Sequence, residues 1–583
     1  MKKHELLKSI FGHEEFREGQ EKLIDELLAG YDVLGVMPTG AGKSMCYQLP
    51  ALMMQGITLV VSPLISLMKD QVMSLKASGV AGAYINSSLT PGQQQEAIRR
   101  ASNGAYKIIY VAPERLQIPA FVSFAQRAEI SLIAVDEAHC VSQWGQDFRP
   151  SYLHIAEFIR KLPKRPPVAA FTATATAKVR EDIIRLLELV EPYQLLTGFN
   201  RPNLRFTNIK PTSKFAMLRS FLEEMGDECG IVYCSTRKTV EDVTEKLNDY
   251  GYSATRYHAG LSDAERRKNQ DAFQYDRARI MVATNAFGMG IDKSNVRFVV
   301  HYNMPRNLES YYQEAGRAGR DGEPAECLLL YSGQDVITGK WMIEHSEDNP
   351  DLTEEQREAV MKMELERLKQ MTYYATSRRC LRQFIRQYFG ETDAPDCCDN
   401  CSVCLEEEFE RDTGSMRITH RMSKEEKRER RLNRQSDAAG LNAWQRALFG
   451  NLKILRGLLA AEQKAPAYTV FSDASLVDMA RRQPKSMDDF LDVSGVGLAK
   501  QERYGKVFLS VIRDGQEPNE ALNDYMDEQR LKRSHKGTRW TEEEDAKLKN
   551  EYFSEVPIQE IATRHGRTLM SIRLRLQKLG MIE

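Results

Sequence analysis

The segment Met37-Pro-Thr-Gly-Ala-Gly-Lys43-Ser44 follows a short apolar run and precedes a helical pattern. Closely spaced glycines let backbone N–H groups point into a concavity, where the N-terminus of the next helix adds positive potential. Lys43 would reach the outer phosphates of a nucleotide, and Ser44 would offer its hydroxyl to Mg²⁺. The usual pattern begins with glycine where this sequence has Met37, so a glycine-rich turn with an incidental lysine is the competing interpretation. The segment favours a strand–loop–helix unit that holds a phosphate.

Short apolar, β-rich runs alternate with helical patterns on both sides of this segment, from about residue 30 to 335. Such alternation indicates βαβ units, and therefore parallel sheets covered by helices. Three hundred residues is long for one sheet, and we place a break near Asn200–Pro202, which predicts two α/β lobes in tandem. The strand-like runs include Asp32–Met37, Thr58–Ser62, Lys107–Ala112, Leu132–Val135, Val168–Thr172, Gly230–Tyr233, Ile280–Ala283 and Val296–His301.

Two further motifs supply the charges that phosphate chemistry needs. The run Leu132–Val135 ends in Asp136 and Glu137, at the edge where parallel sheets place ligands. Asp136 could hold the Mg²⁺ shell and Glu137 could orient and deprotonate the attacking water; ordinary capping acids would explain the first but not both. Arg317 and Arg320 lie between glycines in the second lobe and could cross a cleft to the γ-phosphate, although a basic surface loop is the alternative. Together the three motifs predict nucleotide hydrolysis.

Composition bounds the remaining possibilities. The chain has 583 residues, with 81 Lys+Arg against 82 Asp+Glu, a formal net charge of −1 and a pI of about 6.8. This length suggests about four compact units, and 42% apolar residues fit a globular protein. Any nucleic-acid-binding surface must therefore be a local basic patch. No signal peptide and no uninterrupted apolar run of about 18 residues is present, which predicts a protein of the cytoplasm and no membrane partner.

Five of the ten cysteines fall within 25 positions, which points to metal in a chain without an export signal. The spacing Cys398-x-x-Cys401-x-x-Cys404, with Cys380 upstream, supplies four thiolates for a closed tetrahedral Zn²⁺ site. Cys397 could replace Cys398 if the loop shifts, and an iron–sulfur cluster is a minor alternative.

The order of motifs resembles that of superfamily 2 helicases, and specifically the RecQ family, over residues 1 to about 404. The resemblance implies two RecA-like parallel-sheet lobes, a zinc-binding helical module and small all-α C-terminal domains. It also implies a 3′→5′ ATP-dependent DNA helicase of DNA repair and recombination that uses ATP, Mg²⁺ and Zn²⁺. The motifs are Phe16-Arg17-x-x-Gln20, PTGAGKS, SPLISLMKDQ (62–71), APERL (112–116), DEAH (136–139), SQWGQDFRP (142–150), FTATAT (171–176), YCSTR (233–237), YHAGL (257–261), ATNAFGMGIDK (283–293) and QEAGRAGRDG (313–322).

The resemblance assigns roles to residues at matching positions. Gln20 would read the adenine edge beside Arg17, and His13 stands where many relatives have a stacking aromatic. Trp144, Phe148 and Arg149 lie in the loop that couples DNA contact to hydrolysis, although a tryptophan that fills a core gap is the alternative. The catalytic residues would be Lys43, Asp136, Glu137, His139, Arg317 and Arg320, and the nucleotide-binding residues Arg17, Gln20, Thr39, Gly40, Gly42, Lys43, Ser44 and Asp292. Which of the two arginines meets the γ-phosphate stays open.

The domain boundaries follow from these motifs and from composition. RecQ proteins usually follow the zinc module with a winged helix, and the charged stretch after Cys404 is too short for one. Residues 441–516 resemble the family's HRDC domain; a helical bundle without a nucleic-acid role is the alternative. The predicted units are lobe 1 (1–200), lobe 2 (201–335), the helical hairpin and zinc module (336–404), a charged linker (405–440), the HRDC-like domain (441–516), a linker (517–536) and a helix–turn–helix domain (537–583).

The last unit resembles a Myb-like helix–turn–helix domain. Thr541-Glu-Glu-Glu544 forms a capping box that opens a helix, and the later basic residues include Arg573 and Arg575. These two would contact duplex DNA, and the domain would replace the grip of the missing winged helix. A protein-docking three-helix unit is the alternative.

Three functions are compatible with the motifs. The first is a helicase that acts on single-stranded and forked or partially duplex DNA, with single-strand-binding protein as a possible partner and a place at the bacterial nucleoid. The second is a DNA-binding scaffold switched by ATP, and the third a translocase or strand-annealing protein that unwinds poorly. Complete motifs in both lobes favour the first.

Overall fold

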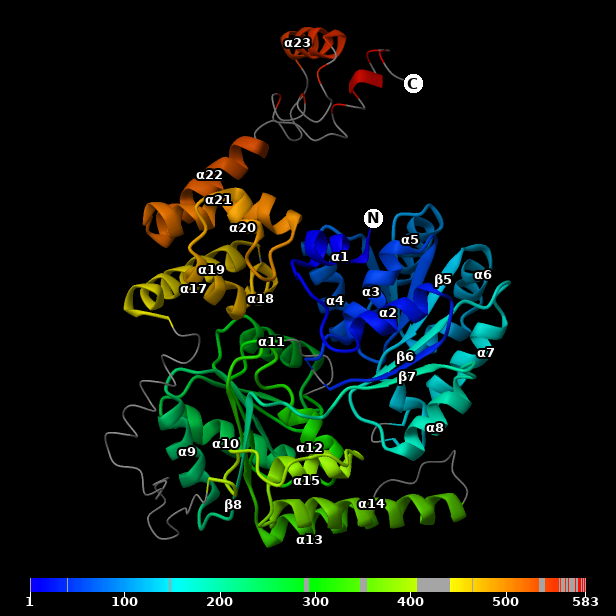
Figure 1. Cartoon of the computed structure of the whole chain (residues 1–583), viewed down its shortest axis with the longest axis vertical. Coiled ribbons are helices and arrows are strands. Elements are labelled where there is room, and N and C mark those ends of the chain that lie inside the picture. Colours follow the sequence, from blue (N-terminus) through cyan, green and yellow to red (C-terminus); the bar gives the residue numbers. More distant parts are fainter. Residues whose placement is uncertain are drawn as a thin grey trace.

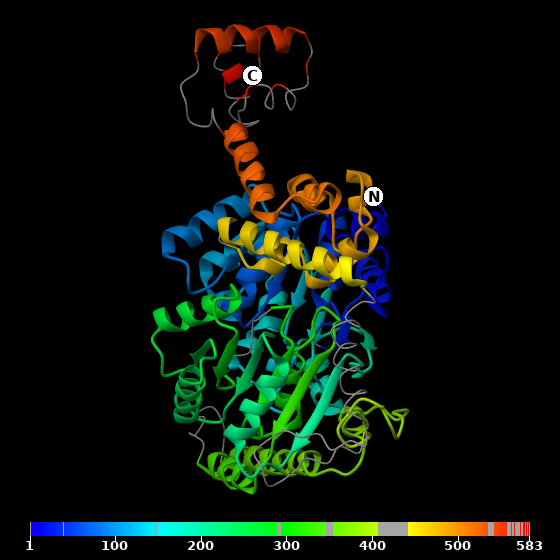
Figure 2. The same cartoon turned by 90° about the vertical axis from the view of Figure 1, so that its left-hand side faces the viewer.

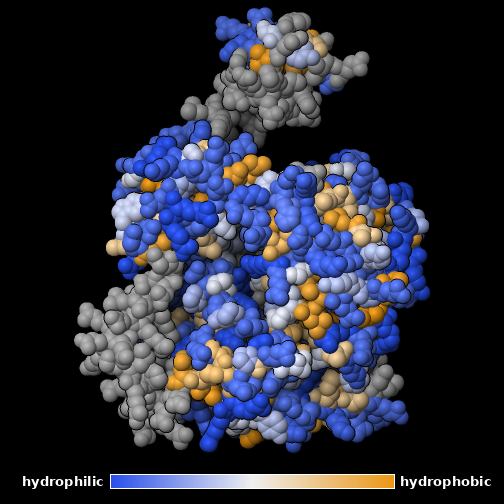
Figure 3. All heavy atoms as spheres, viewed as in Figure 1, coloured by the Kyte–Doolittle hydropathy of each residue, from blue (hydrophilic) through white to orange (hydrophobic). Residues whose placement is uncertain are grey.

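A computed structural model shows two α/β lobes, a helical hairpin with a cysteine cluster, a second helical unit and a small C-terminal domain (Figures 1 and 2). It describes residues 2–38, 40–145, 148–287, 293–345, 354–405, 441–463, 465–533, 541–554 and, beyond these, 556, 561, 565, 572, 575–577, 579 and 581. No helix in these ranges combines the length and the apolarity that crossing a bilayer requires. The visible face in Figure 3 is largely hydrophilic, with scattered apolar side chains.

Lobe 1 is built on a seven-stranded, wholly parallel sheet in the order β3-β4-β2-β5-β6-β1-β7. The central strands are buried along their length because helices cover both faces. The strands are β1 (Val33–Val36), β2 (Ile57–Val61), β3 (Gly82–Ile85), β4 (Ile108–Val111), β5 (Ile130–Val135), β6 (Val168–Thr172) and β7 (Tyr193–Leu196). The helices are α1 (Lys3–Leu6), η1 (Leu7–Phe11), α2 (Gln20–Leu28), α3 (Lys43–Met53), α4 (Ile65–Ala77), α5 (Pro91–Ser102), η2 (Pro113–Gln117), α6 (Pro119–Arg127), η3 (Ala138–Val141), η4 (Pro150–Leu153), α7 (His154–Arg160) and α8 (Ala177–Leu186).

Lobe 2 repeats this plan with a six-stranded parallel sheet in the order β10-β11-β9-β12-β13-β8. The change of sheet falls between Leu196 and Leu204, where the sequence predicts the break. The strands are β8 (Leu204–Ile209), β9 (Gly230–Tyr233), β10 (Ala254–Tyr257), β11 (Ile280–Ala283), β12 (Phe298–His301) and β13 (Ala325–Leu330), and the helices are α9 (Lys214–Met225), α10 (Arg237–Asp249), α11 (Asp263–Gln274) and α12 (Leu308–Ala315).

The hairpin after lobe 2 consists of α13 (Gly333–Glu344) and α14 (Glu354–Ala375), followed by α15 (Leu381–Tyr388) and the cysteine-rich loop. This loop is joined to the edge of lobe 2, since Ser402 N–H donates to Phe206 O of β8 at 2.9 Å. Arg382 of α15 is buried and donates to Leu204 O and Arg201 O. The module therefore braces the segment that connects the two lobes.

The helical unit after the charged stretch extends further than the sequence predicts. The linker predicted over 517–536 instead contains α22 (Pro518–Arg533), whose Ala521 and Tyr525 join the core of the unit. That prediction was wrong because the polar residues of this segment occupy the exposed face of an amphipathic helix. The unit's other helices are α17 (Ala443–Gln463), α18 (Ala467–Val470), α19 (Asp473–Arg482), α20 (Met487–Leu491) and α21 (Leu498–Asp514).

The C-terminal domain begins with α23 (Glu542–Phe553), and Thr541 caps it in the predicted capping box. Leu548, Ile561, Ile572 and Leu576 form its small core. The other two helices predicted from the sequence lie largely outside the described residues.

A buried carboxylate joins the amino ends of β1, β6 and β7. Asp32 is 2% exposed and accepts hydrogen bonds from Val168 N–H at 2.8 Å, from Val190 N–H at 2.7 Å and from the Arg165 guanidinium at 2.6 Å. One side chain thus satisfies backbone donors of two loops, which fixes the strands that carry the glycine-rich segment.

We expect Asp32→Ala to lower the stability of lobe 1 by about 3 kcal/mol, because it leaves two backbone donors without acceptors. For a domain of this size that corresponds to a fall of about 6–12 °C in the first thermal transition. Glu96→Ala, which removes an exposed ion pair with Arg99 and Arg100, is the matched control and should leave the transition unchanged. Equal shifts in the two variants would contradict the role assigned to Asp32.

Candidate functional site

The glycine-rich segment lies at the carboxyl edge of the lobe 1 sheet, between β1 and α3. Gly40 and Gly42 have φ angles of +87° and +82°, a conformation that side chains rarely adopt. Gly42 also lies against the Gln20 amide, which a Cβ would approach to 2.4 Å. Lys43 donates to Met37 O at 3.0 Å, so its ammonium lies inside the loop. Backbone strain and close approach therefore require glycine here, as in a phosphate-binding loop.

The two predicted acids lie beside this loop, because β5 and β1 are separated only by β6 and end at the same edge. Glu137 has a left-handed backbone, with φ of +48°. Burial and the neighbouring Glu137 carboxylate raise the pKa of Asp136 to about 7, while Lys43 opposes the shift. Loss of solvent lowers the pKa of Lys43, which the two acids oppose and the charge of Arg320 reinforces.

The buried His139 links these acids to the neighbouring strand. Its Nδ1 lies 2.8 Å from Thr172 Oγ1 and 3.4 Å from a Glu137 carboxylate oxygen. Thr172 ends β6, and its hydroxyl in turn donates to Thr174 O at 3.0 Å. His139 therefore positions Glu137 from the direction of the sheet, which is a positioning role and not direct contact with a substrate.

Arginines of lobe 2 reach the glycine-rich loop across the interface between the lobes. A Cβ on Gly40 would lie 3.5 Å from an Arg201 guanidinium nitrogen and 3.7 Å from Arg320 Cα. Arg317, 5% exposed, instead lies beside Tyr233 within lobe 2. The structure brings Arg320, and not Arg317, next to the loop.

Arg201 is a site residue that the sequence analysis missed. Its guanidinium donates to Gly319 O at 2.8 Å and to Ala318 O at 3.1 Å, which holds the loop that carries Arg320. Burial lowers the pKa of Arg201, and the nearby Arg320 and Arg17 add to the effect. The only signal in the sequence was its place at the predicted break between the lobes, which says nothing of where the side chain points.

The two residues expected to read the base lie at the opening of the loop. Arg17 donates to Gly40 O. The Gln20 amide donates to Ala41 O at 3.0 Å and to Gly42 O at 3.1 Å, and its oxygen accepts from Arg17 N–H at 2.9 Å. Gln20 thus supports the loop backbone in this structure. An adenine that hydrogen-bonds to the Gln20 amide would have to replace these bonds.

The aromatic loop lies against the helical hairpin and lobe 1. Trp144 is half-buried, with Lys178 Nζ 3.2 Å from its ring centroid, and Arg367 of α14 donates to its carbonyl at 2.5 Å. Phe148 and Arg149 are half-buried in the same loop, and Arg149 donates to Pro63 O at 3.2 Å. The loop therefore contacts α14 of the helical hairpin as well as lobe 1.

The cysteine cluster holds four of the five clustered thiols. The sulfurs of Cys380, Cys398, Cys401 and Cys404 all lie within 4.8 Å of one another, close to the separation of about 3.8 Å that tetrahedral Zn–S bonds of 2.3 Å impose. Backbone N–H groups of Gln383, Cys398 and Cys404 donate to these sulfurs, which favours thiolates. The exposed Cys397 instead lies 3.1 Å from Asp399 Oδ1. The donor set fits zinc.

The remaining predicted site residues are Thr39, Asp292, Arg573 and Arg575. Thr39, Asp292 and Arg573 lie outside the described residues. Arg575 forms an ion pair with Asp545 inside the C-terminal domain, so a contact with DNA would compete with that pair.

Four family models match successive parts of the chain. They are described as DEAD/DEAH box helicase (residues 17–183), Helicase conserved C-terminal domain (213–322), RecQ zinc-binding (333–405) and HRDC domain (445–512).

Proteins of similar sequence match almost end to end. The chain is 38% identical to the ATP-dependent DNA helicase RecQ of Bacillus subtilis, over 87% of this chain and 98% of that protein. The protein of the same name from Pasteurella multocida is 35% identical, over 87% and 93%. Among solved structures, S. cerevisiae Dbp5 bound to RNA and ADP BeF3 covers 60% of this chain and 94% of its own, with 19% identity and a TM-score of 0.46.

Proposed function

The chain belongs to the RecQ family, and from this premise we propose that it hydrolyses ATP to move 3′→5′ along single-stranded DNA and to separate duplex strands. The observation that carries the proposal is the meeting of both lobes at Gly40, where Arg201 and Arg320 of lobe 2 come close to the loop that holds Lys43. A triphosphate between them would make closure of the lobes depend on its γ-phosphate. Hydrolysis and release would then open and close the lobes along a DNA strand.

Each residue of the site has a role in this proposal. Lys43 and Arg320 neutralise the outer phosphates from the two lobes, and Arg201 positions the loop that carries Arg320. Glu137 orients the attacking water and takes its proton, with His139 fixing the direction of its carboxylate. Arg17 and Gln20 bind the base.

The acids also fit a divalent cation. Burial, and after it the charge of Glu137, raises the pKa of Asp136, and Mg²⁺ beside Asp136 and Ser44 would offset both effects. When bound, Mg²⁺ would polarise the phosphoryl oxygens. We propose Mg²⁺ as cofactor on this ground.

Further parts of the proposal concern DNA and location. Trp144, Phe148 and Arg149 would contact the single strand, where bases of any sequence can stack on an aromatic ring. Arg573 and Arg575 would contact the duplex ahead of the fork. Single-strand-binding protein as a partner, and a place in the cytoplasm at the bacterial nucleoid, belong to the same proposal.

We expect strand displacement on 3′-tailed and forked DNA and little on 5′-tailed DNA, in a gel assay with ATP. Lys43→Ala should reduce ATP turnover by about 10²–10³-fold, as loss of a charge-stabilising donor does elsewhere, while single-strand binding persists. The exposed Lys76→Ala is the control and should behave as wild type. Displacement only from 5′ tails would refute the polarity, and hydrolysis without displacement would favour the translocase or annealing alternative.

The two arginines can be separated by lysine substitutions. Arg320→Lys keeps the charge but loses the bidentate fork, and we expect kcat to fall about 10³-fold or more with KM for ATP little changed. Arg317→Lys should keep most turnover, since this residue contacts Tyr233, and the exposed Arg267→Ala is the control. A larger loss in Arg317→Lys than in Arg320→Lys would reverse the assignment.

We propose that Cys380, Cys398, Cys401 and Cys404 hold a structural Zn²⁺, because four thiolates leave no open position for water. Cys398→Ser should lower the zinc content well below one per chain, measured by mass spectrometry of the purified protein. It should also weaken the hydrogen bonds that Arg382 donates to Arg201 O and Leu204 O. The adjacent Cys397→Ser is a matched control and should keep one zinc per chain. Loss of zinc in Cys397→Ser alone would show that the loop is shifted by one residue.

A further inference from the structure

The helical unit of residues 441–533 packs directly on the backbone of lobe 1. Its Gly495 N–H donates to Gly12 O at 2.8 Å. A Cβ on Gly497 would lie 2.5 Å from Ile10 O, and a Cβ on Gly12 would lie 2.4 Å from Val496 N. Two backbones thus meet with no room for a side chain. An approach this close is specific, because it depends on glycine on both sides.

This contact lies next to the part of the nucleotide site that would bind the base. The turn that it touches, Ile10–His13, leads directly into the segment that carries Arg17 and Gln20. Loss of solvent lowers the pKa of His13, and the charges of Arg17 and of Lys500, in the first turn of α21, add to the effect. Asp492 of the same unit also pairs with Lys8 at 3.6 Å. The docked unit therefore touches the turn that leads to Arg17 and Gln20.

The same unit contacts lobe 2. The Gln274 amide at the end of α11 donates to Tyr468 Oη of α18 at 2.8 Å and to Asp70 Oδ2 of α4 at 3.3 Å. One amide thus joins lobe 2 to the helical unit and to lobe 1. In Figure 1 the unit lies beside α1 and above α11, across the junction of the lobes.

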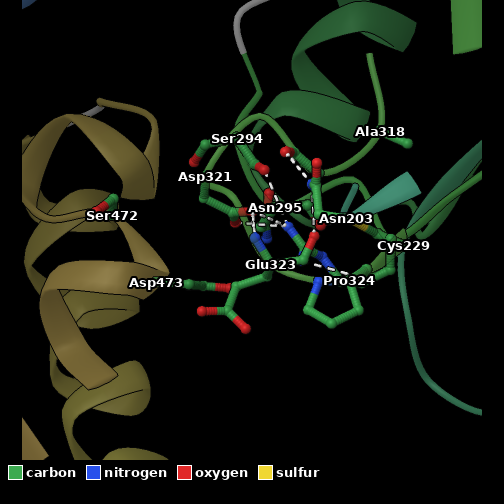
Figure 4. Close-up of polar contacts among 12 residues, drawn as sticks. Asn203, Cys229, Ser294, Asn295, Ala318, Asp321, Glu323, Pro324, Ser472 and Asp473 are labelled. Carbon is green, nitrogen blue, oxygen red and sulfur yellow. Dashed lines mark hydrogen bonds and ion pairs between the residues drawn. The ribbon is translucent and has the colours of Figure 1, made fainter. Parts of the chain in front are cut away.

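The helical unit also comes near the loop that carries Arg320. Figure 4 shows Asp473, at the start of α19, facing Glu323, and Asn203 anchoring this loop from within lobe 2. The two carboxylates are like charges: burial and the charges of Asp321 and Asp473 raise the pKa of Glu323, while Arg297 and Arg481 oppose the shift. Asn203 donates to Gly319 O at 2.8 Å and to Glu323 O at 2.9 Å. Beside this contact lies a cavity of about 480 Å³ between the lobe 2 loop and α19, lined in part by Gly322, Pro324 and Arg481. The loop that carries Arg320 is therefore held from within lobe 2, and the helical unit lies across this cavity from it.

We propose that the helical unit is a positioning element for ATP binding: docked across both lobes, it holds the turn Ile10–His13 in the arrangement that a nucleotide requires. This inference rests on the proposed function. It predicts that undocking weakens ATP binding, and therefore raises KM, without removing any group that takes part in the reaction.

Gly497→Ser tests the proposal. Gly497 has φ of −95° at the N-cap of α21, where serine is a favoured residue, so the unit itself should fold. The added Cβ meets only backbone atoms of Ile10 and Ser9 in lobe 1. Gly457→Ser in α17, where no atom lies within 4 Å of an added Cβ, is the matched control. Tyr468→Phe removes the hydrogen bond on the lobe 2 side and serves as a second variant.

In full-length Gly497→Ser we expect a larger radius of gyration by solution scattering, a 5- to 10-fold higher KM for ATP, and kcat within twofold of wild type at saturating ATP and single-stranded DNA. Tyr468→Phe should shift KM in the same direction by a smaller factor, and Gly457→Ser should change neither quantity. An unchanged KM in an undocked variant would overturn the proposal, and so would a compact Gly497→Ser with wild-type KM. A fall in kcat with constant KM would also overturn it.

Failure of the proposed function would look different. In that case the wild-type protein would show no DNA-stimulated hydrolysis. The affinity for a fluorescent ADP analogue, compared between wild type, Gly497→Ser and Gly457→Ser, would still report whether docking supports nucleotide binding.

Discussion

The structure depends on a concentration of positive charge at the junction of its two lobes. Lys43 and Arg17 come from lobe 1, and Arg201 and Arg320 from the segments that follow it. Desolvation lowers the pKa values of Lys43, Arg17 and Arg201, which means that burial disfavours the charged form of each side chain. Asp136 and Glu137 compensate part of this charge and also repel each other. A polyanionic nucleotide would balance the basic groups, and the Mg²⁺ proposed above would balance the two acids.

This charge cluster can exist because separate parts of the fold fix its members from outside the site. Asp32 holds the far ends of β1, β6 and β7, and His139 with Thr172 holds Glu137. Arg382 of the cysteine-rich module holds the backbone of residues 201–204, and Arg201 holds the arginine loop. The module that fits zinc lies far from the phosphates in sequence, yet it acts on the residue that joins the lobes. Its structural contribution is therefore to hold the segment that joins the lobes.

The sequence predicts those parts of the site that a single sheet determines. Parallel strands end at a common edge, so the segments after β1 and β5 had to meet, and the structure brings Lys43 and Asp136 together. The Cys-x-x-Cys-x-x-Cys spacing likewise favoured four of the five clustered cysteines as metal ligands, and the sulfurs of these four lie together. The sequence did not predict Arg201, the inward turn of Gln20 or the extent of α22. Each of these depends on how two elements distant in sequence pack, and periodicity carries no information on that.

Glycine illustrates the same limit. Gly40 and Gly42 are recognisable from their motif because a phosphate loop requires a left-handed backbone, and their φ angles agree. Gly497 has an ordinary extended backbone, and its local sequence does not distinguish it from Gly457 of α17, where an added Cβ would meet nothing. Its requirement for glycine comes from Ile10, nearly 490 residues earlier in the chain, whose carbonyl occupies the space of a Cβ. The conformation of a residue can be inferred from its neighbours in sequence, whereas a steric exclusion between domains requires that both surfaces be seen.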